Sequence, residues 1–202
     1  MRIHGRTSVI LTSAALLIPF SFSRPGSSGP IAAAAPVGSD DSGFEGGSAM
    51  AFSLKSTAFS NGGEIAKKYT CDGADLSPAL SWDDVPAGAQ SLELIADDPD
   101  APVGTWTHWI LWNISAKTTE LPEGVPRTEA LDNGARQGRN DFKRIGYGGP
   151  CPPAGKPHRY FFKLYALNAR LDVKAGAGRG ELEAGMKGHV LSRAEFMGTY
   201  KR

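Results

Sequence analysis

Short hydrophobic runs separated by turn-forming residues are the feature that most restricts how this chain folds. From residue 51 onward, aromatic and β-branched residues gather in runs of six to nine residues, and clusters of Gly, Pro, Asp and Asn separate them. Such spacing is typical of an all-β protein, because each run suits a strand and each cluster favours a turn. We expect strands at Ser91–Ala96, Thr107–Ile114, Arg159–Leu167 and Ala194–Tyr200.

One segment near the C-terminus departs from this pattern. Leu182, Met186 and Val190 recur at every fourth position. This spacing predicts a helix over Gly180–Val190, although Gly185 and Gly188 weaken it. The sequence shows no alternation of strands and helices and no GxGxxG or GxxxxGK[ST] string, which argues against a nucleotide-binding parallel sheet. We predict a mainly antiparallel, Greek-key-like β-sandwich of about 150 residues with one or two short helices.

The first 50 residues differ from the rest in composition. MRIHGR carries two arginines and leads into the apolar run TSVILTSAALLIPFSF, which is typical of a secretory signal peptide. With cleavage within Ala32–Ala35, we expect a signal peptide over 1–35, a disordered linker over 36–50 and one folded domain over 51–202. The mature protein would be periplasmic or secreted and would lack a transmembrane span. A membrane tether formed by an uncleaved N-terminal segment is the alternative.

Charge and cysteine content exclude several classes of function. A chain that begins at residue 36 carries 19 Lys and Arg against 21 Asp and Glu, so it lacks the basic surface that nucleic-acid binding needs. Two cysteines are too few for a disulfide-dense scaffold, a four-cysteine zinc site or a cysteine-ligated cluster. In an oxidising compartment, Cys71 and Cys151 are expected to form one disulfide, and two separate buried thiols are the alternative.

Polar side chains stand where three of the expected strands begin or end. Every second residue of a strand shares a face. Three such faces are apolar except at one end: Leu92, Leu94, Ala96 and Asp98; His108, Ile110, Trp112 and Ile114; and His158, Tyr160, Phe162, Leu164 and Ala166. If the strand from residue 91 pairs antiparallel with both others, the polar ends meet at one end of one sheet. We therefore expect Asp98, His108 and His158 to lie together, with Asp98 favouring a protonated His108.

Each of these groups also has a purely structural interpretation. Asp97, Asp98 and Asp100 in DDPDAP also fit a turn, since aspartate before proline favours turn initiation. His108, between two tryptophans, fits a hydrogen-bonded core histidine. The stretch Gly146–His158 holds four glycines and four prolines. It is either a rigid connection or a loop whose free backbone amides bind an anion.

The strings DDPDAP, THWILWNI and YGGPCPPAGKPHRYFFKLYAL together resemble the signature of the phosphatidylethanolamine-binding protein family, in its bacterial branch called Raf kinase inhibitor-like. The likeness covers Phe52–Tyr200 and includes YTCDG, SPALSW and the start of GTYKR. It implies a sandwich of antiparallel sheets with one small surface pocket for phosphate-type anions or the phosphoethanolamine head group of a phospholipid. By motif, the pocket would comprise Asp98, His108, the backbone of Gly149, Pro150 and Cys151, His158 and Tyr160, with Asp100, Pro102 and Trp106 forming its wall.

The residues and the resemblance together predict an exported, non-catalytic binding protein that acts as a carrier, a sensor or an inhibitor of a partner protein. Imidazoles and a phenol hydrogen-bond phosphate oxygens, so anion affinity should fall as pH rises through the histidine pKa. A phosphoester hydrolase or a metal-assisted enzyme using the same His and Asp groups is the alternative. The sequence shows no GxSxG or HExxH motif and no nucleophile beside those groups, and we expect neither a cofactor nor a metal.

Overall fold

The computed structural model describes residues 51–202 and folds them into antiparallel sheets. The predicted signal peptide over 1–35 and linker over 36–50 lie outside the described residues. No helix within residues 51–202 is long and apolar enough to cross a membrane. The elements, in chain order, are β1 (Ser53–Lys55), η1 (Lys67–Tyr69), β2 (Leu80–Asp83), β3 (Ser91–Asp98), β4 (Trp106–Ser115), β5 (Glu120–Leu121), β6 (Arg136–Gln137), β7 (His158–Leu167), α1 (Arg179–Met186) and β8 (Val190–Tyr200).

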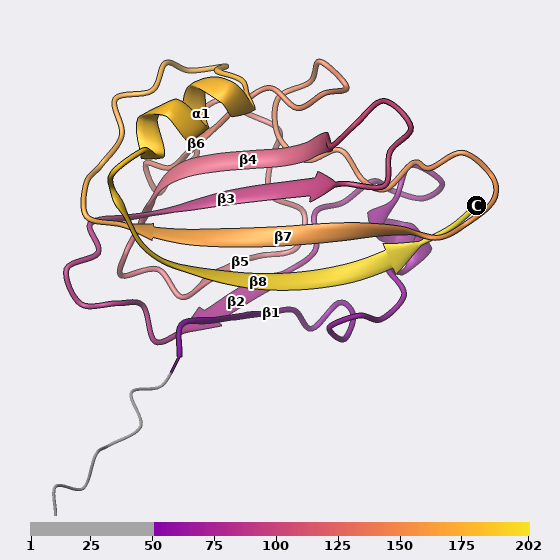
Figure 1. Cartoon of the computed structure of the whole chain (residues 1–202), viewed down its shortest axis with the longest axis horizontal. Helices are drawn as coiled ribbons and strands as arrows, with labels where there is room; N and C mark the ends of the chain where they lie inside the picture. The colour runs from indigo at the N-terminus through magenta and orange to yellow at the C-terminus, as the bar shows by residue number, and fades with distance from the viewer. Residues whose placement is uncertain (1–50) are drawn as a thin grey trace, which may run out of the picture. The chain divides into compact units, whose positions relative to one another are not determined.

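Two sheets account for the strands of this region. The larger has the strand order β6-β4-β3-β7-β8 and the smaller has the order β1-β2-β5. All strand pairs within them are antiparallel. Figure 1 shows β3, β4, β7 and β8 side by side, with α1 near β4. The predicted mainly antiparallel β-sandwich is therefore confirmed, and each of the four predicted strands is present.

The larger sheet is covered on both faces, and this explains the burial of its central strand. One face packs against the smaller sheet, and the other packs against α1. Every residue of β3 is consequently buried, including its charged ones. Between the sheets lie, among others, Leu80, Trp82, Leu92, Leu94, Trp109, Leu111, Phe162 and Leu164. Under α1 lie Ile95, Ile110, Trp112, Leu182 and Met186.

The predicted face of β4 is wrong, because β4 is not a regular strand. Its pairing with β3 shifts twice, and each shift gives β4 one residue more than β3. As a result, Ile110 faces α1 whereas Ile114 faces the smaller sheet. The bulge at His108 places this side chain against the Tyr160 ring, on the face opposite Ile110. The alternation of β4 side chains between the two faces of the sheet is therefore broken between His108 and Ile110 and again between Ile110 and Ile114.

The helix is also shorter than predicted. It ends at Met186, whereas the spacing of Leu182, Met186 and Val190 extends it to Val190. Gly188 has φ 82°, a conformation that glycine adopts readily and that ends helices. Val190 begins β8 and is 46% exposed, so only the first two residues of the apolar pattern contribute to the core.

Candidate functional site

A cavity of about 190 Å³ opens at the end of the larger sheet, where β3 ends and β4 and β7 begin. Because β3 pairs antiparallel with both neighbours, Asp98, His108 and His158 all reach this end, as the strand pattern predicts. The lining residues are Asp98, Ala101, Pro102, Val103, Trp106, His108, Phe142, Cys151, Pro152, Pro153 and His158.

Asp98 binds His158, the first residue of β7. His158 Nδ1 lies 2.8 Å from Asp98 Oδ2, and both residues are buried. The second carboxylate oxygen, Oδ1, accepts a hydrogen bond of 2.8 Å from the Asp100 amide. A carboxylate only accepts hydrogen bonds, so Nδ1 of His158 carries the proton. The direct contact of Asp98 is therefore with His158 rather than with His108.

His108 is held by the backbone instead. Its Nδ1 lies 2.6 Å from the Gly148 carbonyl oxygen, which can only accept, so Nδ1 is the protonated nitrogen. The Gly148 amide donates in return to the His108 carbonyl at 2.9 Å. Burial lowers the pKa of His108, and this effect outweighs the opposing effects of the Gly148 carbonyl and the Asp98 charge. Asp98 favours the protonated form of His108, as expected, but its effect is smaller than that of burial.

Tyr160 lies beside the cavity rather than in its wall. Its ring contacts the His108 ring edge to face, with the centroids 5.2 Å apart. Its hydroxyl is buried and makes no hydrogen bond to any described residue. Burial, reinforced by the nearby Asp98 carboxylate, raises the pKa of Tyr160. Tyr160 thus orients His108 by packing, and a ligand in the cavity as it stands would not contact the Tyr160 hydroxyl directly.

Asp100 also lies outside the cavity wall and fixes the start of β7. Its carboxylate accepts hydrogen bonds from the Arg159 amide at 3.0 Å, from Arg159 Nε at 2.9 Å and from Arg159 Nη2 at 2.7 Å. These bonds lower the pKa of Asp100 to about 2. The loop after β3 is thereby tied to the residue that follows His158. Of the other two predicted wall residues, Pro102 and Trp106 both line the cavity.

The glycine- and proline-rich loop contributes less backbone to the cavity than predicted. The Gly149 amide donates to Asp75 Oδ1 at 2.6 Å and is therefore committed. Pro150 has no amide proton, and its carbonyl accepts from the Cys71 amide at 3.1 Å. Neither Gly149 nor Pro150 lines the cavity, whereas Cys151 does. Cys151 is therefore the one residue of the predicted backbone segment that a ligand in the cavity would meet.

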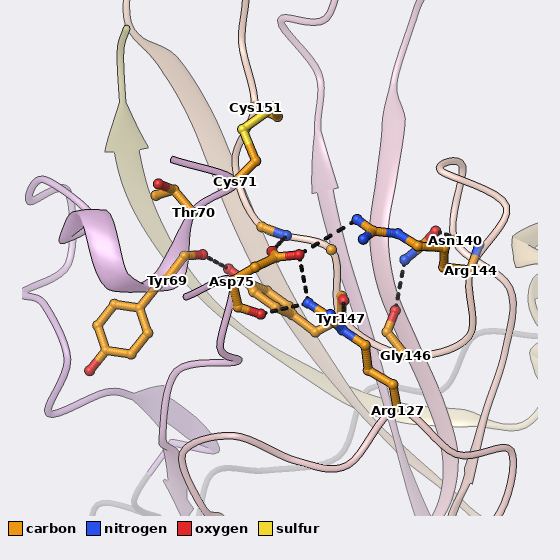
Figure 2. A network of polar contacts seen from close by, with 12 residues as sticks. Tyr69, Thr70, Cys71, Asp75, Arg127, Asn140, Arg144, Gly146, Tyr147 and Cys151 are labelled. Carbon is orange, nitrogen blue, oxygen red and sulfur yellow. Dashed lines mark hydrogen bonds and ion pairs between the residues drawn. A yellow bond between two sulfur atoms is a disulfide. The ribbon is translucent and has the colours of Figure 1, made fainter. Parts of the chain in front are cut away.

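Asp75 anchors this loop, and Figure 2 shows its contact with Arg127. Arg127 Nη2 donates to Asp75 Oδ2 and to the Asp75 carbonyl, both at 2.6 Å, and Arg127 Nε donates to the Tyr147 carbonyl at 2.9 Å. A Cβ atom at Gly149 would come within 2.8 Å of Asp75 Oδ1, so glycine is needed there. The anchor explains how a loop with few regular hydrogen bonds keeps one conformation.

A sulfur pair links the same loop to the segment after η1. The Cys71 and Cys151 sulfurs lie at bonding distance, with their Cα atoms 5.4 Å apart, and Figure 2 draws the bond between them. Because Cys151 lines the cavity, this sulfur pair lies at one of its walls. Within residues 51–202, no group of three or more His, Cys, Asp or Glu side chains is arranged to hold a metal ion.

Several residues of the site carry no signal in the sequence. Phe142 lines the cavity and contacts the His108 ring with centroids 5.3 Å apart, yet it lies in GRNDF, a turn-like string. Asp75 and Arg127 lie 52 residues apart and form no motif. Only the tertiary structure brings these residues to the loop. Pro152 and Pro153 fall inside the stretch that the sequence marks as rigid.

Comparison with known proteins agrees with this architecture. A UPF0098 protein of Methanothermobacter thermautotrophicus is 52% identical over 149 residues, which is 74% of this chain and 98% of that protein. A UPF0098 protein of Aquifex aeolicus is also 52% identical over 149 residues, covering 73% of this chain and 86% of that protein. These names assign no activity.

Two crystal structures resemble the fold described above. One is a putative phosphatidylethanolamine-binding protein homologue from Chlamydia trachomatis, with a TM-score of 0.69 and 44% identity over 75% of this chain and 98% of that one. The other is an E. coli protein described as a new member of the mammalian family, with a TM-score of 0.71 and 34% identity over 76% of this chain and 99% of that one. Residues 55–201 match the family described as phosphatidylethanolamine-binding protein. This chain therefore belongs to the phosphatidylethanolamine-binding protein family.

Proposed function

We propose that this protein binds phosphate-type anions, including phosphoethanolamine and phospholipid head groups, in the cavity at the end of β3. The observation that carries the proposal is the placement of two imidazole rings in one cavity wall. His108 and His158 both line the cavity, and each uses Nδ1 for a partner inside the protein. Nε2 is thus the nitrogen that each ring has left for a ligand: it donates to a phosphate oxygen when it carries a proton and accepts a hydrogen of the ligand when it does not.

The remaining wall supports binding of a small head group. Most of it is apolar or aromatic: Ala101, Pro102, Val103, Trp106, Phe142, Pro152 and Pro153. A wall of this kind excludes water and strengthens the few polar contacts inside. A volume of about 190 Å³ is below the range of about 300–1,000 Å³ usual for drug-sized ligands. We infer that a head group fits inside and that any acyl chains stay outside.

We infer that the protein binds its ligand without transforming it. No serine or threonine lines the cavity among residues 51–202, and the Cys151 sulfur lies at bonding distance from Cys71. The carboxylate of Asp98 already accepts hydrogen bonds at both oxygens. A hydrolase would need a free nucleophile or an activated water in this position. From the sequence of residues 1–35 we further infer that the protein acts after export, in the periplasm or outside the cell.

Calorimetric titration of the whole protein with phosphoethanolamine tests the proposal. We expect saturable binding that is weakened roughly tenfold or more in His158→Ala, because the ligand then loses a charge-assisted hydrogen bond. His189→Ala is the matched control, since this exposed histidine contacts Asn168 and lies outside the cavity wall. Turnover of p-nitrophenyl phosphate that is absent from the His158→Ala variant would overturn the binder in favour of the hydrolase.

A further inference from the structure

We propose that this protein binds the head group of a phospholipid while the lipid stays in its bilayer, and that two apolar loops beside the cavity dock on the membrane surface. This inference rests on the proposed function, because it presumes that a head group enters the cavity. It goes further by naming the partner surface and the residues that contact it. Three observations carry it: the size of the cavity, the exposed apolar side chains beside it and the charges around them.

The cavity has room for a head group but not for acyl chains. Its volume is about 190 Å³. Two larger cavities among residues 51–202, of about 270 Å³ beside α1 and about 340 Å³ beside β5, share no lining residue with it. Each acyl methylene group that moves from the bilayer into water lowers the affinity by a factor of about four. A lipid is therefore bound far more tightly with its chains left in the bilayer, and this requires the cavity to lie against the membrane surface.

Exposed apolar side chains border the cavity from two loops. Val103, in the loop between β3 and β4, lines the cavity and is 78% exposed, more than any other large hydrophobic side chain within residues 51–202. Pro102 beside it is also exposed. Pro153, in the loop before β7, lines the cavity from the second loop and is exposed as well. Figure 1 shows both loops at the same end of the larger sheet. Exposed apolar groups gathered at one place are typical of a surface that contacts a membrane or a partner protein.

Both loops are anchored to the larger sheet. In the first loop, the Asp100 carboxylate accepts a hydrogen bond of 2.9 Å from Arg159 Nε at the start of β7. In the second loop, the Gly155 amide donates to the Arg202 carbonyl, just beyond the end of β8, at 3.4 Å. Loops that are already held in place lose little conformational freedom when they dock. Val103 is therefore exposed on an anchored loop, which suits insertion into the interface of a bilayer.

The charges at this end of the sheet suit an anionic lipid surface. Three lysines close in the chain to the cavity wall or to the end of β8 are exposed and make no salt bridge within residues 51–202: Lys143, Lys156 and Lys201. The nearby carboxylates that contact a guanidinium group are those of Asp72, Asp75 and Asp100. Asp141 has no such partner and accepts a hydrogen bond from the Thr107 amide at 2.7 Å. The unpaired charge is therefore positive overall, and each lysine near an anionic bilayer raises the affinity roughly fivefold.

Two assays on the whole protein test the inference: sedimentation with vesicles of equal parts phosphatidylethanolamine and phosphatidylglycerol, and calorimetric titration with free phosphoethanolamine. The ratio of the two affinities separates the membrane contact from the head-group contact. In Val103→Ser we expect this ratio to fall roughly tenfold, because the apolar side chain no longer enters the bilayer. Val190→Ser is the matched control, since this exposed valine lies at the end of β8 opposite to Tyr200, the partner of His158. Comparing variants of one chain cancels any contribution of residues 1–50.

A second pair of variants tests the contribution of charge. Lys156→Gln should bind the same vesicles roughly fivefold more weakly, and high salt should remove this difference. Its affinity for free phosphoethanolamine should stay the same, because Lys156 lies outside the cavity wall. Lys117→Gln is the matched control, since this exposed lysine follows the far end of β4. Equal vesicle affinities of the two lysine variants would overturn the proposed membrane contact.

The remaining outcomes separate failure of the inference from failure of the proposed function. Binding of phosphoethanolamine without binding of vesicles, or equal affinity ratios in Val103→Ser and Val190→Ser, would overturn the inference alone and would point to a partner protein on the apolar loops. His158→Ala should lower the vesicle affinity roughly tenfold, and an unchanged affinity would overturn the inference, because docking would then not involve the cavity. Transfer of fluorescent phosphatidylethanolamine between vesicles would also overturn it, because the lipid would then leave its bilayer. Absence of binding in both assays would overturn the proposed function itself.

Discussion

Replacing Glu93 with glutamine is expected to stabilise the fold by about 3 kcal/mol above pH 7 and to leave its stability almost unchanged near pH 4. Glu93 lies in the middle of β3 and is fully buried. Its Oε2 atom has no hydrogen-bond partner within residues 51–202. A buried carboxylate with an unpartnered oxygen is unfavourable, so the residue is more stable with its proton.

The neighbouring serine supports the same conclusion. Ser91 Oγ lies 2.7 Å from Glu93 Oε1 and 2.6 Å from the Ala169 carbonyl oxygen. A hydroxyl has one proton and cannot donate to both oxygens at once. If Glu93 is protonated, its acid group donates to Ser91 Oγ and the serine donates to Ala169, so every oxygen contact has a hydrogen. Glutamine retains the contacts with Ser91 and Ala169, because its amide N–H replaces the acid proton, and it gives up only the 3.4 Å hydrogen bond that Oε1 accepts from the Asn113 amide.

The magnitude follows from the pKa. Burial raises the pKa of Glu93 from 4.5 to about 7 in the folded protein. One pKa unit corresponds to about 1.4 kcal/mol, so burial disfavours the charged form of Glu93 by about 3 kcal/mol in the folded protein. The pKa of Glu93 is higher in the folded protein than in the unfolded protein. The wild type therefore has its full free energy of unfolding below pH 4.5 and loses about 3 kcal/mol of it as pH rises toward 7. Glutamine does not titrate, so the variant avoids the loss.

Urea unfolding of wild type and Glu93→Gln at pH 4.5, 6 and 8 measures the effect as the difference in unfolding free energy. The difference between the two proteins isolates Glu93 from the other titrating groups. Glu129→Gln is the matched control; this exposed residue should change stability by less than about 0.5 kcal/mol at each pH. A stability difference between wild type and Glu93→Gln that stays constant from pH 4.5 to 8 would refute the reasoning.

Three further predictions concern the loop that carries Cys151. Asp75→Asn keeps a residue that tolerates φ 55° but loses the charged acceptor for Gly149 and Arg127, so thermal unfolding should show a loss of about 1.5–3 kcal/mol. Gly149→Ala places a Cβ against the Tyr69 backbone and should cost about 1–3 kcal/mol in urea unfolding. Thiol counting on the unreduced, denatured protein should find no free Cys71 or Cys151. Reduction should then cost up to about 4.5 kcal/mol for a loop of 80 residues, and two free thiols before reduction would contradict the bridge.

The fold and part of the site follow from patterns that act over a few residues. Alternating apolar side chains locate the central strands, and polar residues at the ends of those strands locate Asp98 and His158. The predictions that fail are those that depend on contacts between residues far apart in the sequence. The faces of β4 depend on two bulges that only the partner strand reveals. The partner of Asp98 is His158 rather than His108, because His108 is satisfied by the Gly148 carbonyl, and no sequence pattern predicts that bond.

The strand β3 shows why the candidate site lies at its end and not elsewhere along it. The strand buries three carboxyl groups under two covering layers, and a buried carboxylate needs either a proton or a partner. Glu93 is stabilised by protonation, and Asp97 by an ammonium and a guanidinium group at 2.8 and 2.7 Å. Of the three, Asp98 alone has an imidazole partner, His158, and alone lines the cavity. A ligand in the cavity can therefore meet only the carboxyl group of Asp98, whereas those of Glu93 and Asp97 lie away from the cavity.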